Sequence, residues 1–240
     1  AAGCSVIIKP ASETPLTMLA LMPILEEAGV PKGLVNVLPT DNAAVLTEKL
    51  LLDPRVRVIS FTGSTSVGKI ILKVASEQVL KPAMELGGNA PLIVFDDADL
   101  DESVNGAMLA KMRNLGEACT AANRFYIQDN IYDAFVQKFT AKMKALKVGN
   151  GLDKSVDVGP LVNEKTISKV EMLVNDALSK GAKILLGGKR LKNKGYFFPP
   201  TVLTDIPDNA KCLKDEIFGP VATIQKFTNQ DEVIKRANDT

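Results

Sequence analysis

The hydrophobic positions of the first 80 residues form short apolar runs separated by longer amphipathic stretches. The apolar runs predict strands at residues 5–8, 34–38 and 56–61, and the first run, with Cys4 beside it, is typical of a buried strand. The amphipathic stretches predict helices at residues 15–28, 43–52 and 67–78. Short apolar strands that alternate with helices predict a parallel sheet covered on both faces, with ligands beyond the carboxyl ends of the strands.

A second set of elements follows residues 81–82, Lys-Pro. Strands are expected at residues 83–86, 91–95, 125–128, 183–186, 201–204 and 221–227. Helices are expected at residues 101–113, 132–146 and 164–180. The fold class that this order predicts is α/β, with a domain boundary near Glu85 that gives domains 1–85 and 86–240. A strand close to the first residue and a helix ending at the last residues lead us to expect a piece of a longer protein.

Composition narrows the class of protein. The 240 residues suit one large or two modest domains, and 46% hydrophobic with 24% charged residues is an ordinary globular balance. A net charge of +1 gives no field that would draw nucleic acid or an anionic membrane. No apolar run reaches transmembrane length, and the first residues lack the basic start of a signal peptide. We therefore expect neither nucleic acid nor a membrane as a partner.

The chain has three cysteines and no histidine. The wide spacing of Cys4, Cys119 and Cys212 argues against a disulfide framework and indicates a reducing, cytoplasmic setting. Without histidine or a Cys-x-x-Cys pair, no metal site is expected. Cys4 and Cys212 are expected to be small buried thiols. Any chemistry of Cys119 must use a carboxylate, a backbone dipole or a cofactor, which excludes papain-like, caspase-like and Ser-His-Asp mechanisms.

Residues 61–69, Phe-Thr-Gly-Ser-Thr-Ser-Val-Gly-Lys, join a predicted strand to a predicted helix. Gly63 permits a tight turn, and the start of the helix offers N–H groups to a phosphate. The spacing is close to that of a P-loop, but Ile70 stands where a hydroxyl must hold magnesium, so a P-loop ATPase or kinase is disfavoured. An ordinary capped helix start remains the alternative for this segment.

Three further side chains are candidates at strand ends or in loops. Lys9 ends the first strand and could reach a ribose hydroxyl or a phosphate; it could equally be a solvated charge. Glu85 precedes two glycines, and partial burial would raise its pKa as a general base requires, unless it is a surface glutamate at a turn. Cys119 follows a helix in a loop, where reactive residues concentrate, although a lone cysteine is more commonly a small buried thiol.

Taken together, in order and spacing, these segments resemble the aldehyde dehydrogenase family from the first residue to the last. The matching segments are residues 9–15 (Lys-Pro-Ala-Ser-Glu-Thr-Pro), 61–64 (Phe-Thr-Gly-Ser), 85–88 (Glu-Leu-Gly-Gly), 116–119 (Gly-Glu-Ala-Cys) and 216–220 (Glu-Ile-Phe-Gly-Pro). Glu117 replaces the glutamine usual before the cysteine, which is a mild departure. The resemblance implies part of a Rossmann-like cofactor domain in residues 1–85 and an incomplete α/β catalytic domain in residues 86–240.

The resemblance also implies roles for individual residues. Cys119 would attack an aldehyde to form a thiohemiacetal, hydride would pass to the nicotinamide, and Glu85 would activate the water that hydrolyses the thioester. Residues that would contact the cofactor are Lys9 (adenosine ribose), Ser12, Gly63, Ser64 (pyrophosphate), Gly68, Leu86, Glu216 (nicotinamide ribose) and Phe218 (nicotinamide pocket).

Two positions are similar to the succinate-semialdehyde dehydrogenase branch of the family. Arg113, six residues before Cys119, resembles an arginine that holds the distal carboxylate of the substrate. Ser12 stands where many NAD-preferring members carry glutamate, so we expect NADP, with NAD possible. Ala121 excludes the disulfide switch of members that carry a second cysteine there.

The segments that the resemblance leads us to expect outside this chain include the family's oxyanion-stabilising asparagine and an arm that joins subunits. Losing one oxyanion donor costs about 100-fold to 1000-fold in rate, so we expect the isolated chain to be inactive or nearly so. Because the arm joins subunits in the family, we expect the parent protein to be a homo-oligomer. The alternatives are an aldehyde dehydrogenase for neutral aldehydes and a non-catalytic fragment that retains nucleotide-binding elements.

Overall fold

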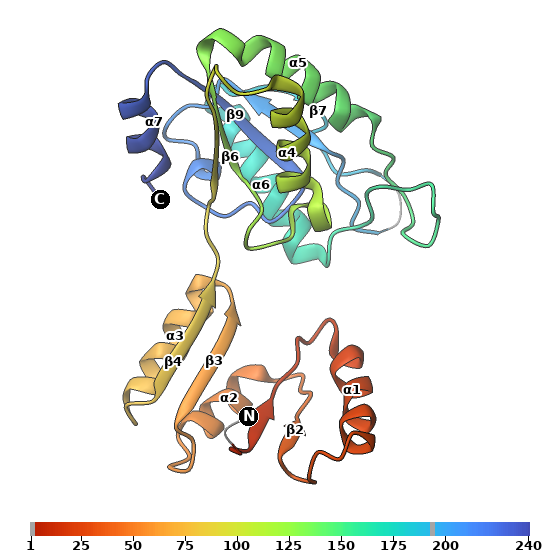
Figure 1. Cartoon of the computed structure of the whole chain (residues 1–240), viewed down its shortest axis with the longest axis vertical. Helices are drawn as coiled ribbons and strands as arrows, with labels where there is room; N and C mark the ends of the chain where they lie inside the picture. Colours follow the sequence, from red (N-terminus) through yellow and green to blue (C-terminus); the bar gives the residue numbers. More distant parts are fainter. Residues whose placement is uncertain (1–2, 193–194) are drawn as a thin grey trace. The chain divides into compact units, whose positions relative to one another are not determined.

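The computed structural model describes residues 3–192 and 195–240, which divide into two compact units (Figure 1). The first unit ends at Leu86 and the second begins at Gly87, one residue beyond the boundary expected from the sequence. Each unit is described by itself.

The first unit contains two small parallel sheets and three helices. Its strands are β1 (Val6–Ile8) with β2 (Val35–Val37), and β3 (Val58–Gly63) with β4 (Lys81–Leu86). Its helices are α1 (Pro15–Glu27), α2 (Ala43–Leu51) and α3 (Thr65–Ser76). The core of this unit is small and consists of Leu51, Ile71, Ala75 and Leu80 with partly buried neighbours. The parallel direction agrees with the sequence, whereas the single covered sheet is not observed among the described strands.

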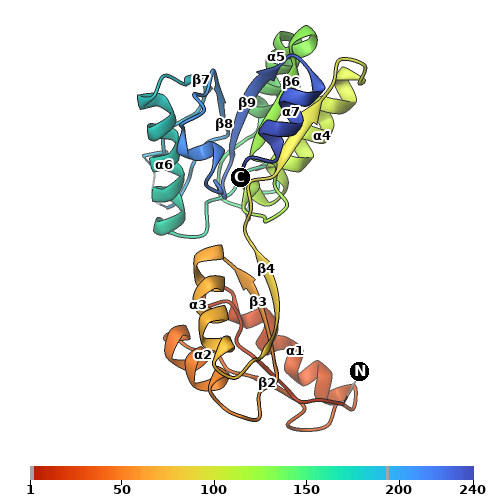
Figure 2. The same ribbon diagram turned by 90° about the vertical axis from the view of Figure 1, so that its left-hand side faces the viewer.

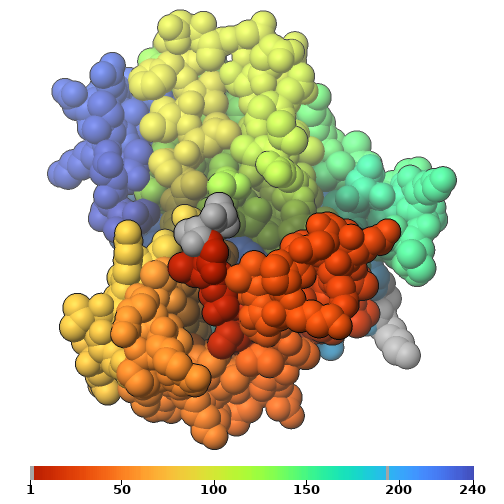
Figure 3. Space-filling model, turned by 60° about the horizontal axis from the view of Figure 1, so that its bottom comes forward, coloured from red at the N-terminus to blue at the C-terminus, as the bar shows by residue number. Residues whose placement is uncertain are grey.

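The prediction of a buried first strand is wrong. Val6 is 42% and Ile7 46% exposed, and Cys4 is exposed as well. Helix α1 has no buried residue and lies open on the face seen in Figure 3. An apolar run indicates that a strand is suited to burial, but whether it is buried depends on which elements pack over it. Within the described residues β1 pairs with β2 alone, and the three residues of β2 are only partly buried.

The second unit is built on a five-stranded sheet in the order β5-β6-β9-β8-β7, with β7 antiparallel to its neighbour (Figure 1). The strands are β5 (Pro91–Val94), β6 (Arg124–Gln128), β7 (Lys183–Leu186), β8 (Thr201–Thr204) and β9 (Val221–Phe227). The helices are α4 (Leu100–Met112), α5 (Asp129–Ala145), α6 (Glu164–Ser179) and α7 (Gln230–Ala237), with short 3-10 turns η1 (Arg113–Gly116) and η2 (Lys211–Leu213).

Helices cover both faces of this sheet, as Figure 2 shows with α6 on one side and α4 and α5 on the other. The α4–α5 side is filled by aromatic side chains such as Phe125, Phe135 and Phe139, all 0% exposed. The α6 side is filled by aliphatic residues such as Val170 and Leu203. Burial of this extent is a large favourable contribution to the stability of the second unit, because each fully buried large apolar side chain contributes roughly 1.5–3 kcal/mol.

Helix starts differ from the sequence prediction by a few residues. Helix α3 begins at Thr65 and α5 at Asp129, two and three residues before the predicted starts. The first turn of each helix is polar, so the hydrophobic period does not reveal it, whereas the capping side chain of Ser64 does.

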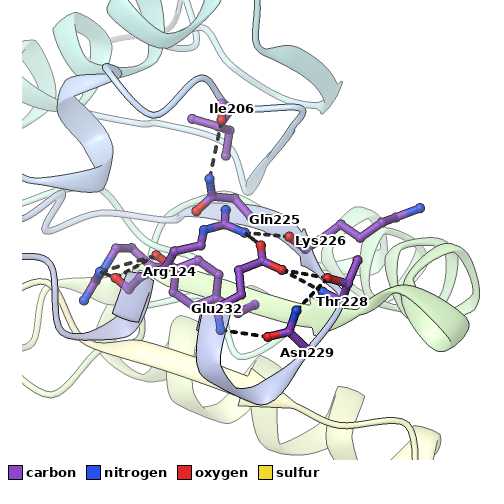
Figure 4. A network of polar contacts seen from close by, with 9 residues as sticks. Arg124, Ile206, Gln225, Lys226, Thr228, Asn229 and Glu232 are labelled. Atoms are coloured by element: carbon purple, nitrogen blue, oxygen red, sulfur yellow. Dashed lines mark hydrogen bonds and ion pairs between the residues drawn. The ribbon is translucent and has the colours of Figure 1, made fainter. Parts of the chain in front are cut away.

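Arg124 connects the start of the second unit to its last helix, and Figure 4 shows Arg124 in the network of polar contacts beside that helix. Its guanidinium is buried and donates to the carbonyl oxygens of Asn89 at 2.8 Å, Arg236 at 2.9 Å and Ala237 at 2.8 Å. The last two carbonyls belong to the C-terminus of α7, where a cation is favoured by the helix dipole. Arg124 therefore holds both the segment around Asn89, at the start of the second unit, and the end of α7.

The described residues include no helix that is both long and apolar enough to cross a membrane. Between residues 3 and 192 and from 195 to 240, no group of three or more histidine, cysteine, aspartate or glutamate side chains is arranged to hold a metal ion.

Candidate active site

The loop that carries Cys119 has an unusual backbone. After α4 ends at Met112, Asn114, Leu115 and Gly116 have φ values of 50°, 60° and 76°, a run of left-handed residues. Asparagine and glycine adopt this region readily, but leucine pays a conformational cost. Asn114 holds the turn closed, because its side chain donates to the carbonyl of Glu117 at 2.8 Å and its own carbonyl accepts from the Glu117 N–H at 2.9 Å. Strain of this kind persists where the surroundings dictate the conformation.

Cys119 itself is exposed and free, as the expected reactive thiol requires. Cys212, in contrast, is buried, and burial raises the pKa of its thiol to about 11. The expectation for Cys212 is confirmed, and the small buried thiol that was the alternative for Cys119 is not observed. Arg113 is exposed at the start of the same loop, and among the described residues no ion pair involves it.

A second loop, residues 215–220, lies against the Cys119 loop. Gly116 is so close to Gly219 that a Cβ atom at position 116 would stand 2.3 Å from the Gly219 carbonyl oxygen. Phe218 is partly buried and has a φ of 60°, another left-handed residue without the freedom of glycine. Glu216 is partly buried too, and a Cβ at Gly87 would stand 2.5 Å from its carboxylate. The structure therefore brings Cys119, Glu216 and Phe218 onto two loops in direct contact.

Glu117 ties the Cys119 loop to the segment before α6. Its carboxylate accepts a hydrogen bond of 3.1 Å from the Val162 N–H. Half-burial raises the pKa of this carboxyl, and the hydrogen bond from Val162 opposes that rise. The one departure from the family's motif is thus also a contact that holds the loop.

Lys111 is a site residue that the sequence did not reveal. It lies in the last turn of α4, is 0% exposed, and donates to the Asn123 side-chain oxygen at 2.9 Å and the Gly219 carbonyl at 3.3 Å. Burial lowers its pKa to about 7. The signal that could have identified it is a lysine between apolar neighbours in residues 107–112, Ala-Met-Leu-Ala-Lys-Met.

The first unit brings together five of the expected residues at the carboxyl ends of β3 and β4. Gly63 pairs with Leu86 in register, Ser64 caps α3, and Gly68 is buried against the Leu86 side chain, where a Cβ would stand 2.6 Å from a Leu86 methyl. Glu85 pairs with Thr62, one position earlier. Its side chain is exposed, so the partial burial expected for a general base is not observed.

Lys9 and Ser12 follow the end of β1, which belongs to the other small sheet of this unit. The Lys9 ammonium donates to the carbonyl of Pro10 at 2.6 Å, and Ser12 is exposed. The expected site residues thus fall into two groups, one in each unit. Lys9, Ser12, Gly63, Ser64, Gly68, Glu85 and Leu86 belong to the first unit, and Arg113, Cys119, Glu216 and Phe218 to the second.

These features define an α/β protein with a free thiol on a strained loop, held against a loop that carries a carboxylate. The model of the aldehyde dehydrogenase family matches residues 1–240 of the chain, which therefore belongs to that family.

Similarity to individual proteins extends over the whole chain. It is 48% identical over 240 residues to the NADP+ succinate-semialdehyde dehydrogenase GabD of Escherichia coli (strain K12), covering 100% of this chain and 50% of the relative. It is 49% identical over 240 residues to the glutarate-semialdehyde dehydrogenase of Pseudomonas aeruginosa, with coverage of 100% and 50%. A crystal structure of an E. coli NADP-dependent enzyme matches with 48% identity and a TM-score of 0.97, again covering 100% of this chain and 50% of the other. The chain spans about half the length of the curated relatives it matches.

Proposed function

We propose that this chain contributes the nucleophile and much of the cofactor site of an NADP-dependent semialdehyde dehydrogenase. The observation that carries the proposal is the exposed, free thiol of Cys119 on a strained loop packed against the Glu216–Phe218 loop. Residues 1–85 would belong to the cofactor-binding domain and residues 86–240 to the catalytic domain. Membership of the aldehyde dehydrogenase family supports this assignment.

The chemistry assigns a separate task to each side chain. The Cys119 thiolate adds to the aldehyde carbon and forms a tetrahedral adduct. This adduct can expel a hydride, whereas the free aldehyde cannot. NADP+, when bound, accepts that hydride, and a thioester on Cys119 remains. Water then attacks the thioester, Glu85 takes the proton, and the carboxylic acid leaves as the thiol is regenerated. The exposure of Glu85 is compatible with contact to that water.

Several residues fit the phosphate and ribose groups of a dinucleotide. At the start of α3, Ser64 and the residues of the first turn are exposed, and the start of a helix offers N–H groups that suit a pyrophosphate. The Glu216 carboxylate suits a ribose diol as a hydrogen-bond acceptor. Ser12 near Lys9 offers a hydroxyl and an ammonium to a 2′-phosphate where a carboxylate would repel it. NADP in the printed name of the E. coli relative favours NADP over NAD.

Arg113 favours a substrate that carries a carboxylate in addition to its aldehyde group. Its guanidinium is exposed, six residues before Cys119, and could bind a distal carboxylate through two hydrogen bonds. Succinate semialdehyde and glutarate semialdehyde, the substrates in the names of two relatives, both carry such a group. A neutral aldehyde would leave Arg113 without a partner and is the second candidate substrate class.

A protection experiment on the 240-residue chain tests this function. Iodoacetamide alkylates Cys119, and mass spectrometry follows the rate with and without aldehyde. Succinate semialdehyde should slow alkylation by forming the thiohemiacetal, and Arg113→Gln should weaken that protection without changing protection by hexanal. Equal protection by both aldehydes in both variants would favour the neutral-aldehyde class. No protection by any aldehyde, with Cys119 no faster than Cys4, would favour a non-catalytic nucleotide-binding fragment.

Steady turnover by the isolated chain is not expected under this proposal, and NADPH formation by the purified chain would contradict it. A homo-oligomeric parent protein and a cytoplasmic location also stay predictions.

A further inference from the structure

A buried lysine lies behind the Cys119 loop without a carboxylate. Lys111 is 0% exposed, and its two hydrogen-bond acceptors, the Asn123 side-chain oxygen and the Gly219 carbonyl, are both neutral. No described carboxylate forms an ion pair with it. Burying an ammonium costs free energy that neutral acceptors only partly offset. A lysine retained at such a place needs a reason beyond packing.

The hydrogen bond from Lys111 to Asn123 joins the two ends of the Cys119 loop. Lys111 precedes the loop and Asn123 follows it, so their hydrogen bond of 2.9 Å joins the two ends through side chains. A backbone hydrogen bond joins the same two ends, because the Ala122 N–H donates to the Ala110 carbonyl at 3.0 Å. The span between them contains the left-handed residues and Cys119.

The second acceptor belongs to the loop of Glu216 and Phe218. The Gly219 carbonyl oxygen receives Lys111 at 3.3 Å and the Val221 N–H at 2.8 Å. Gly116 of the Cys119 loop packs against that same oxygen. One carbonyl is therefore the point where both loops and the lysine meet.

We propose that Lys111 is a positioning residue, whose buried amine fastens the loop carrying Cys119 to the loop carrying Glu216 and Phe218. The positioning of a nucleophile against a cofactor contact rests on the proposed function, whereas the fastening of one loop to the other does not. A neutral amine has two N–H groups, which match the two acceptors. The third N–H of an ammonium would have no acceptor among the described residues.

Charged neighbours on the surrounding elements do not offset this charge. In the Cys119 loop, the Glu117 carboxylate accepts from the Val162 N–H. On β6, the Arg124 guanidinium turns to the Asn89 carbonyl and the end of α7. In the loop of residues 215–220, Glu216 lies against Gly87, and Asp215 is exposed. Burial is the single cause of the lowered pKa of Lys111, so the amine is neutral above pH of about 7.

The protonation state then sets how tightly the two loops are joined. If opening of the loops lets Lys111 reach water, the open state binds a proton that the closed state lacks between pH of about 7 and 10.5. Closure is therefore favoured increasingly as the pH rises above 7. Below pH 7 both states are protonated and the dependence disappears.

Hydrogen exchange of the 240-residue chain between pH 6 and 9, corrected for intrinsic rates, tests this. Protection of peptides covering residues 112–122 and 215–221 should be flat below about pH 7 and should rise together, by up to about tenfold per pH unit, above it. Lys111→Met should remove the rise. Glu117→Gln, which removes a half-buried carboxyl from the loop and leaves Lys111 in place, should keep the rise. Peptides of α6 serve as the reference.

A flat profile in the unaltered chain, a rise that survives in Lys111→Met, or a rise in only one loop would overturn the proposal. If Lys111→Met fails to fold, judged by circular dichroism and α6 protection, the profiles of the unaltered chain and Glu117→Gln still decide. The measurement uses neither aldehyde nor cofactor. An unreactive Cys119 would therefore contradict the proposed function without affecting this result.

Discussion

Gly116 and Gly219 approach each other so closely that no side chain fits between them: a Cβ at position 116 would stand 2.3 Å from the Gly219 carbonyl oxygen. Position 116 also has a φ of 76°, where residues other than glycine are strained. The contact joins the Cys119 loop to the Glu216 loop with no intervening side chain. Small changes at this point should therefore be large in effect.

Gly116→Ala should destabilise the loop for two reasons that add, the clash and the left-handed backbone. Together they should cost on the order of 2–4 kcal/mol in the free energy of unfolding of the second unit. Urea unfolding followed by far-ultraviolet circular dichroism measures this. Gly88→Ala is the matched control, because a Cβ there meets no atom within 4 Å and φ is not positive. Similar midpoints for both variants would show that the close approach is not a real constraint.

Glu117→Gln should leave the loop intact and change its pH dependence. Glutamine keeps an oxygen for the Val162 N–H, which now donates to Glu117 at 3.1 Å. Because half-burial raises the pKa of Glu117, the unfolded chain loses this proton first as the pH rises. Glu117 thus subtracts stability once the pH passes the unfolded value of about 4.3, and the loss is complete above its folded pKa.

The variant should therefore be equal to the unaltered chain at pH 4 and slightly more stable at pH 7, by less than about 1 kcal/mol, since the group is only half buried. Thermal unfolding at the two pH values measures the difference. A variant that is less stable at pH 7 would mean that the charge itself holds the loop.

The three cysteines should separate into two accessible thiols and one inaccessible thiol. Cys4 and Cys119 are exposed, whereas Cys212 is buried with its pKa raised to about 11. In the folded chain at pH 7.5, iodoacetamide should label Cys4 and Cys119, and label Cys212 only after denaturation. Peptide mass spectrometry of a time course measures all three rates in one sample. Labelling of Cys212 at a rate like that of Cys4 would show that the core of the second unit around Cys212 is accessible to the reagent.

The sequence predicts the elements well and the contacts between them poorly. Strands such as β5 and β6 are recognisable because each contains a short apolar run, and the order of elements then predicts the α/β fold class. The same apolar pattern made β1 look buried, because hydrophobicity does not say what covers a strand. Lys111 escaped notice for a related reason: its partners Asn123 and Gly219 are 12 and 108 residues away, and no local pattern encodes such pairing.

Arg124→Met should be the most damaging of these substitutions to the second unit. The buried guanidinium serves three backbone carbonyls, of Asn89, Arg236 and Ala237, and methionine would leave them without this donor. A hydrogen bond from a charged group contributes about 1.5–3 kcal/mol, so a loss of more than about 3 kcal/mol is expected. Arg190→Met is the matched control, since Arg190 pairs with Glu164 and Glu171 at the surface and should cost less than about 1 kcal/mol. Urea unfolding compares the two variants, and hydrogen exchange should show α7 losing protection first in Arg124→Met. Equal unfolding midpoints would mean that α7 is held by its apolar face alone, through Val233.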